Sequence, residues 1–257
     1  MLKAFICLSV ASLIIANIFG CSQPNIPDEP IQVIVTDGGD ETVTIENQSE
    51  SIIDDIIFLG ESTTYHLKSR GVLKDGKNTK QVWSPKSGTL MLDASTGDCR
   101  IVYPETNEEI SLSEALKRKQ PKIITLTFGL NGAPSFITRG RDYFKFCYKK
   151  LLDTIKEVSP STKIIINSCF PIAKNMDMSR YTVDAKTLNL YIDALNAWAC
   201  ELAKENGARF IDSASVLKDS EGYLNTRFQV EDGYHLNADA YKLILKYFKE
   251  ELKNEEN

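Results

Sequence analysis

The chain has 257 residues, of which 42% are hydrophobic and 25% charged, and its formal net charge is −5. This composition is that of an ordinary globular protein, and the length is enough to build one sizeable core. The negative charge gives no reason to expect a nucleic-acid partner, because surfaces that bind nucleic acid are basic.

The amino-terminal residues have the layout of a secretory signal peptide. Lys3 precedes an apolar run from Ala4 to Gly20 that is too short and too weakly flanked to predict a membrane-spanning helix. The run is followed by Cys21, in the sequence IFGC, which resembles the cleavage site of bacterial lipoproteins. We therefore expect residues 1–20 to be removed, Cys21 to carry a lipid, and the rest of the protein to be extracytoplasmic and anchored to the bacterial cell membrane. An uncleaved anchor helix and a plain secretory signal are the alternatives.

Residues 21–51 have the composition of a flexible tether. They are rich in Pro, polar residues and acids, and no Lys or Arg occurs between Lys3 and Lys68. Such a segment cannot bury enough apolar surface to order itself. The sequence therefore predicts an acidic spacer that holds a single domain, residues 52–257, away from an anionic membrane surface.

From residue 52 onward, apolar runs alternate with amphipathic helical patterns. The runs are rich in Ile, Leu, Val and Phe, as in strands buried on both faces, and cover residues 52–60, 122–129, 163–168 and 208–213. The helical patterns cover residues 111–119, 141–158, 187–206 and 237–252, with Ser111 and Asn237 at N-cap positions. Strands that alternate with single helices predict a three-layer α/β/α sandwich with a central parallel sheet.

Polar side chains that could take part in catalysis follow these predicted strands. In sheets of this kind, ligands bind beyond the carboxyl ends of the strands. Ser62 follows the first strand in the sequence FLGEST, and Asn131 follows the second in FGLNG. The chain has only two histidines, and His235 stands before the last helix with Asp232 three residues ahead of it. Alone, Ser62 would be interpreted as a helix N-cap. Together, the four residues predict a site at one edge of the sheet.

These segments resemble the sequence blocks of the SGNH hydrolases, the GDSL-type esterase family. The sequence around Ser62 is similar to the family's Gly-Asp-Ser turn, with Glu61 in place of Asp. Residues 129–131 match its Gly-x-Asn block, and residues 232–235 match its Asp-x-x-His block. The resemblance covers roughly residues 52–252 and implies an α/β/α sandwich of the SGNH or flavodoxin-like type.

Two further positions bear on the resemblance. Gly88, in the sequence SPKSGTL, offers a match to the family block that consists of a single loop glycine. Gly132 stands where many members carry Asp after the Asn. This change and Glu61 indicate a divergent branch, but neither removes a reacting group.

The resemblance implies a catalytic triad in which Ser62 is the nucleophile, His235 the base and Asp232 the residue that orients the imidazole. It assigns the oxyanion hole to the amide of Ser62, the amide of Gly88 and the side chain of Asn131. It implies neither a metal ion nor an organic cofactor. His66, four residues after Ser62, is expected to be a partly buried structural residue or, alternatively, a substrate contact.

The expected function is that of an extracytoplasmic carboxylic ester hydrolase that works through an acyl-Ser62 intermediate. Its substrates would be short-chain acyl or acetyl esters on small molecules or glycans, and its membrane contact would be the lipid on Cys21. Two alternatives stay open at this stage. The same triad can transfer an acyl group to a surface sugar, as an O-acyltransferase, or the protein can be a glycan-binding lipoprotein without catalysis.

Overall fold

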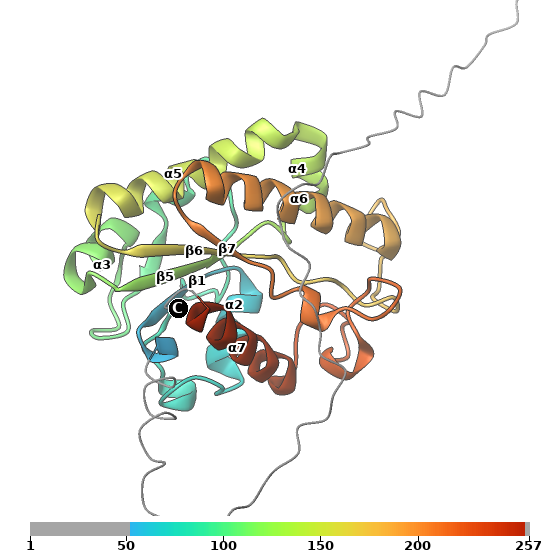
Figure 1. Ribbon diagram of the computed structural model, residues 1–257, viewed down its shortest axis with the longest axis horizontal. Helices are drawn as coiled ribbons and strands as arrows, with labels where there is room; N and C mark the ends of the chain where they lie inside the picture. Colours follow the sequence, from blue (N-terminus) through green and yellow to red (C-terminus); the bar gives the residue numbers. More distant parts are fainter. Residues whose placement is uncertain (1–51, 255–257) are drawn as a thin grey trace, which may run out of the picture. The chain divides into compact units, whose positions relative to one another are not determined.

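A computed structural model describes residues 52–254 of the chain (Figure 1). The expected signal peptide, the lipidation at Cys21 and the acidic tether lie outside the described residues. Within residues 52–254, the helices are too short or too polar to cross a membrane. Cys147 and Cys169 are buried free thiols in this part of the chain, and Cys99 is a partly buried one.

The centre of the fold is a five-stranded sheet in the order β2-β1-β5-β6-β7, and all of its strand pairs are parallel. The strands are β1 (Ile56–Gly60), β2 (Val82–Trp83), β5 (Ile123–Thr127), β6 (Lys163–Asn167) and β7 (Arg209–Ile211). Gly60 pairs with Thr127, so β1 and β5 end at the same level. Segments that follow these two strands therefore emerge side by side.

Helices cover both faces of the sheet (Figure 1). One layer contains α3, α4, α5 and α6, and the other contains α2 and α7. Their bounds are Ser62–Ser69 for α2, Leu112–Lys119 for α3, Ala133–Arg139 for α4, Arg141–Val158 for α5, Ala185–Glu205 for α6 and Ala238–Lys253 for α7. The predicted α/β/α sandwich with a central parallel sheet is confirmed.

The strand side chains explain why two layers are needed. Ile57 and Leu59 of β1 belong to the apolar core under α3–α6, whereas Ile56 and Phe58 belong to the core under α2 and α7. Successive residues of a strand point to opposite faces, so a run that is apolar at every position must be covered on both. Both faces of the sheet are therefore buried, and only its edges and the ends of its strands are accessible to a substrate.

Several element boundaries differ from the predictions. The first strand begins at Ile56 rather than residue 52, because Asp54 and Asp55 form ion pairs with Lys74 and Lys122 and cannot enter the buried sheet.

The predicted N-caps are confirmed: Ser111 accepts from the Glu114 amide at 3.2 Å, and Asn237 accepts from the Ala240 amide at 3.0 Å.

The sequence did not predict the smaller elements. These are β2, α4, an antiparallel pair formed by β3 (Arg100–Val102) and β4 (Glu109–Ser111), and 3-10 turns at Gly76–Asn78, Thr96–Asp98, Ser215–Leu217 and Thr226–Phe228. Each has too few residues to produce a recognisable hydrophobic period.

Candidate active site

A sharp turn between β1 and α2 presents Ser62 at the edge of the sheet. The strand ends at Gly60, and the helix begins at Ser62. A Cβ atom at position 60 would overlap the Thr64 hydroxyl and the Thr127 carbonyl oxygen, so only glycine fits. Ser62 is partly exposed, and its hydroxyl bonds to another residue instead of capping the helix. The N-cap interpretation of Ser62 is therefore wrong.

A continuous chain of hydrogen bonds joins Ser62, His235 and Asp232. The Ser62 Oγ atom lies 3.0 Å from His235 Nε2, and His235 Nδ1 lies 2.6 Å from Asp232 Oδ2. The other carboxylate oxygen, Oδ1, accepts from the backbone amides of Tyr234 at 2.9 Å and His235 at 2.8 Å. Gly233 has a φ of 69°, which allows the loop to fold Asp232 back onto the imidazole.

The Asp232 carboxylate determines the tautomer of His235. Partial burial works against its ionisation, but the hydrogen bonds from the His235 amide and ring and from the Tyr234 amide lower the pKa of Asp232 overall. An ionised carboxylate can only accept, so the proton of the imidazole is on Nδ1. His235 Nε2 is then an acceptor for the Ser62 hydroxyl proton.

Glu61 links the nucleophile turn to the loop that carries Asn131. Its side chain is only 1% exposed. Its Oε1 accepts from the Gly129 amide at 2.9 Å, and its Oε2 accepts from the Asn131 amide at 3.1 Å. Burial raises the pKa of Glu61 to about 7, against the opposing effect of these backbone hydrogen bonds. The substitution of Glu for the family's Asp thus retains a carboxyl group that supports the turn.

The side chain of Asn131 is held at both of its polar atoms. Its Nδ2 donates to Thr89 Oγ1 at 3.2 Å, and its Oδ1 accepts from the Tyr234 hydroxyl. An amide nitrogen carries two protons, so the bond to Thr89 leaves one N–H for another acceptor. The structure thus brings Asn131 to the same edge of the sheet as Ser62 and His235.

Tyr234 contacts two members of this group. Its ring packs edge-on against the His235 ring, with centroids 4.5 Å apart and an interplanar angle of 81°. Burial and the nearby Glu61 carboxyl raise the pKa of Tyr234, so its hydroxyl stays protonated and can donate to Asn131. From the sequence alone, its place next to His235 was the only indication of a role.

Gly88 lies in a loop that reaches the site, but its amide is already engaged. The N–H donates to the Pro85 carbonyl at 2.9 Å, and φ is 76°. A Cβ at this position would lie 3.2 Å from the Tyr65 ring. The next residue, Thr89, contacts Asn131. The role of Gly88 as an oxyanion donor stays a prediction, and this amide would have to share or release its bond to Pro85.

His66, in α2, packs against the imidazole ring of His235. Its ring centroid is 4.4 Å from that of His235, with an interplanar angle of 44°. Burial, followed by the effect of His235, lowers the pKa of His66 to about 4, so the ring is neutral. Its Nδ1 atom is buried and has no hydrogen-bond partner among residues 52–254. Among residues 52–254, no group of three or more His, Cys, Asp or Glu side chains is placed to hold a metal ion.

Comparisons with known proteins identify the family of the chain. Residues 58–243, more than half of the chain, match the model of the GDSL-like lipase/acylhydrolase family. A candidate platelet activating factor from Streptococcus pneumonia has a similar structure, with a TM-score of 0.51 and 17% identity over 80% of this chain and 92% of that one.

Two other solved structures are more distant. A GDSL-like lipase from Bacteroides thetaiotaomicron has a TM-score of 0.49 and 16% identity, over 81% of this chain and 95% of that one. The periplasmic domain of a lipopolysaccharide acetyltransferase from Salmonella Paratyphi A has a TM-score of 0.48 and 16% identity, over 77% and 83%. No curated protein matches the sequence.

The matched range contains every residue of the hydrogen-bonded group. It begins in β1, before Ser62, and continues past His235 into α7. The Streptococcus structure, at its level of identity, shows the shared fold. The chain belongs to the GDSL-like lipase/acylhydrolase family.

Proposed function

We propose that the protein is a serine esterase that hydrolyses carboxylic esters through an acyl-Ser62 intermediate. One observation supports this most directly: the bonds from Ser62 to His235 and from His235 to Asp232, at 3.0 and 2.6 Å. A serine hydroxyl is a weak nucleophile near neutral pH and needs an adjacent base. A non-catalytic glycan-binding protein would not need this alignment.

In the acylation step, Ser62, His235 and Asp232 act in the order of their hydrogen-bonded chain. Ser62 Oγ attacks the ester carbonyl carbon as its proton moves to His235 Nε2, and Asp232 stabilises the imidazolium that forms. The tetrahedral intermediate then collapses, and the C–O bond to the alcohol breaks. The alcohol leaves with the proton from Nε2. Water, deprotonated by the same nitrogen, attacks the carbonyl carbon of acyl-Ser62. The bond from this carbon to Ser62 Oγ then breaks, the carboxylic acid leaves, and His235 returns the proton to Oγ.

The negative oxygen of the tetrahedral intermediate needs hydrogen-bond donors. As the first residue of α2, Ser62 has an amide that lies outside the internal hydrogen bonds of the helix. The second N–H of Asn131 Nδ2 is the other donor that the geometry supports, and the Gly88 amide is a third candidate. Removal of one such donor from an esterase typically lowers the rate by about 10²–10³.

The proposal includes the cellular location of the protein and the class of its substrates. The signal-like residues 1–20 and Cys21 support an extracytoplasmic protein that a lipid holds at the membrane. In that location, acyl or acetyl esters on glycans or small molecules are the substrates within reach.

A chromogenic acetyl ester and a fluorophosphonate probe test the proposal. Wild-type protein should hydrolyse the ester and be labelled at Ser62, and Ser62→Ala should lose both properties. Label on another serine, or full hydrolysis by folded Ser62→Ala, would contradict it. Addition of an acceptor sugar then distinguishes hydrolysis from transfer, because a transferase would produce acylated sugar in place of free acid.

A further inference from the structure

A polar groove lies next to the candidate active site. It is open to solvent and has a volume of about 380 Å³. Its lining includes a tyrosine, two amides and three lysines: Tyr65, Asn78, Asn107, Lys68, Lys77 and Lys86. Tyr65 and Lys68 belong to α2, the helix that begins with Ser62.

Two contacts connect this groove with the catalytic group. Tyr65 stands three residues after Ser62, so the two side chains are neighbours on one side of α2. The Tyr65 ring also packs against Gly88, and the next residue, Thr89, bonds to Asn131. The wall of the groove is therefore formed partly by the same helix and loop that carry Ser62 and approach Asn131.

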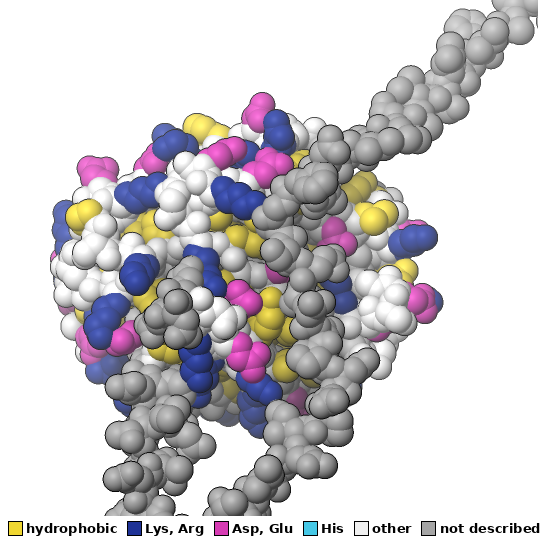
Figure 2. All heavy atoms as spheres, in the orientation of Figure 1, with side chains coloured by type: hydrophobic (Ala, Val, Ile, Leu, Met, Phe, Trp, Pro, Cys, Tyr) yellow, Lys and Arg dark blue, Asp and Glu magenta, His cyan; other side chains and the backbone are white. Residues whose placement is uncertain are grey.

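The groove is positively charged, and two of its three lysines, Lys68 and Lys77, have no ion-pair partner among the described residues. No Asp or Glu is among its lining residues. Within residues 52–254, no carboxylate lies within 4.0 Å of the ammonium groups of Lys68 or Lys77, and the 76%-exposed Lys86 lies 3.8 Å from Glu109. On the face seen in Figure 2, by comparison, acidic and basic side chains are intermixed.

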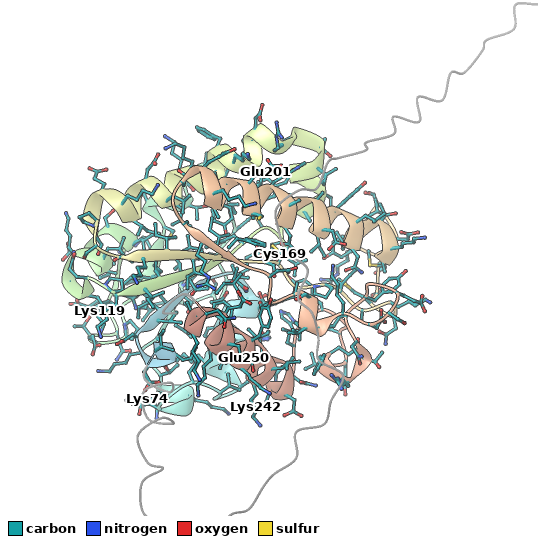
Figure 3. The ribbon with its side chains drawn as sticks, in the orientation of Figure 1. Lys74, Lys119, Cys169, Glu201, Lys242 and Glu250 are labelled. Atoms are coloured by element: carbon teal, nitrogen blue, oxygen red, sulfur yellow. The ribbon has the colours of Figure 1, made fainter. Side chains whose placement is uncertain are left out.

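In a second groove, near the start of the strands, the lysines are paired with carboxylates. Its four lysines are Lys74, Lys80, Lys119 and Lys122, and Figure 3 labels Lys74 and Lys119. Each has a carboxylate partner: Asp54 for Lys74 at 3.3 Å, Glu105 for Lys80 and for Lys119 at 4.0 Å, and Asp55 for Lys122 at 2.8 Å. Although the chain has a net charge of −5, the groove beside Ser62 contains two lysines, Lys68 and Lys77, without an ion-pair partner among the described residues.

We propose that the groove beside Ser62 binds the alcohol portion of the substrate and that this portion is an acidic glycan, with carboxylate or phosphate groups. This rests on the proposed esterase function. Ammonium groups on flexible stems bind such anions as point charges. The amides of Asn78 and Asn107 and the tyrosine supply the hydrogen-bonding groups that sugar hydroxyls need. The volume is also larger than one acetyl group requires.

Binding experiments test the groove without dependence on turnover. Calorimetry on the full chain would use unacylated oligogalacturonate, a phosphorylated oligosaccharide and a neutral maltooligosaccharide of equal length. We expect one or both anionic glycans to bind and the neutral one to bind more weakly. The triple variant Lys68→Gln/Lys77→Gln/Lys86→Gln should raise the Kd for the anion about 5- to 20-fold, since each partly solvated charge contributes a few-fold.

The matched control is Lys74→Gln/Lys122→Gln, which removes lysines from the ion-paired groove and should leave the Kd unchanged. Added salt should weaken binding by the wild type more than by the triple variant. Failure of both anionic glycans to bind, or equal binding of the neutral one, would overturn the inference. So would an unchanged Kd in the triple variant.

Kinetics separate this inference from the proposed function. The triple variant should hydrolyse a small neutral acetyl ester at the wild-type rate but show a raised KM for an O-acetylated acidic oligosaccharide. If the groove does not bind the glycan but the protein is an esterase, the wild type will still hydrolyse the small ester. If the proposed esterase function is wrong, the wild-type protein will hydrolyse no ester at all.

Discussion

The Oε2 atom of Glu61 accepts a hydrogen bond from the Asn131 amide at 3.1 Å, although 70 residues separate the two in sequence. Glu61 immediately precedes Ser62, so one buried carboxyl group fixes the spacing between the proposed nucleophile and a proposed oxyanion donor. Its second oxygen holds the Gly129 amide at 2.9 Å. A residue that takes no part in bond making thus connects the nucleophile turn to the loop that carries Asn131.

Glu61 should make stability depend on pH in a definite direction. Its pKa is about 7 in the folded protein against 4.5 for the ordinary group, so the folded state favours the protonated form. The stabilisation from this group is full below pH 4.5 and is lost as pH rises toward 7, on the order of 3 kcal/mol in all. Chemical denaturation of wild type and Glu61→Gln at pH 4.5 and 8 would measure it.

Glu61→Gln should remove this contribution to the pH dependence. A glutamine accepts with one atom only, so the variant also loses one buried hydrogen bond, at about 1–3 kcal/mol. The control is Glu157→Gln, on the exposed side of α5, for which we expect the wild-type pH profile. A Glu61→Gln protein with the wild-type pH dependence would show that the Glu61 carboxyl does not titrate in this range.

His66 should contribute with the opposite sign. Its pKa is lowered to about 4 in the folded protein, from 6.5, so unfolding takes up a proton between these values. Its stabilisation is therefore present above pH 6.5 and is lost as pH falls toward 4. His66→Phe keeps an aromatic ring against His235 and should flatten the unfolding profile in this window. The variant should retain ester hydrolysis within about threefold, because His235 remains the only base; a loss as large as that of His235→Ala would assign His66 to the chemistry.

The Tyr234 hydroxyl should act on the rate of the reaction through Asn131. Tyr234→Phe keeps the ring against His235 but removes the donor that fixes Asn131 Oδ1. We expect kcat to fall about 5- to 10-fold with little change in KM, the effect of one hydrogen bond. Tyr148→Phe is the matched control: it removes a buried hydroxyl bonded to the Leu126 carbonyl, in the core, and should lower stability without a change in kcat. An unaltered kcat in Tyr234→Phe would mean that Asn131 needs no such support.

The sequence could predict the sheet because β1, β5 and β6 are rich in Ile, Leu and Phe, and it could place Ser62 and Asn131 because each lies within four residues of the end of one of these strands. It could not predict β2, which is two residues long, or α4, which is a seven-residue helix separated from α5 by one glycine. Elements this short do not produce a hydrophobic period that can be recognised in the sequence.

The supporting contacts of the site were beyond sequence reasoning for a different reason. The pairs Glu61–Asn131 and Tyr234–Asn131 lie 70 and 103 residues apart, and only the register of the sheet and the path of the last loop bring them together. The Asp232–His235 pair was predictable because three residues of one loop connect its members. The resemblance to a family identified residue types, whereas burial and orientation needed the fold.

The proposed lipid attachment at Cys21 predicts a change in location on substitution of this residue. Cys21→Ala should release the protein from the membrane fraction or leave it as an unprocessed precursor, since no lipid could then be attached. Cell fractionation and metabolic labelling with a fatty-acid analogue would measure both effects. Cys99→Ala, a free and partly buried cysteine within the folded domain, is the control and should not change location. Membrane retention and normal processing of Cys21→Ala would exclude the lipoprotein proposal.

The proposed triad predicts a pattern of rates that a structural role would not produce. Ser62→Ala and His235→Ala should each lower kcat to the same residual level, and the double variant should be little worse, because residues that act as one unit are strongly non-additive. Asp232→Asn should be milder or comparable, since it disturbs the orientation and tautomer of His235 without removing the base. Purified proteins assayed on one acetyl ester, with circular dichroism to confirm folding, give the comparison. If the losses in Ser62→Ala and His235→Ala multiplied in the double variant, the 3.0 Å bond between them would be a structural contact and the nucleophile would have to be sought elsewhere.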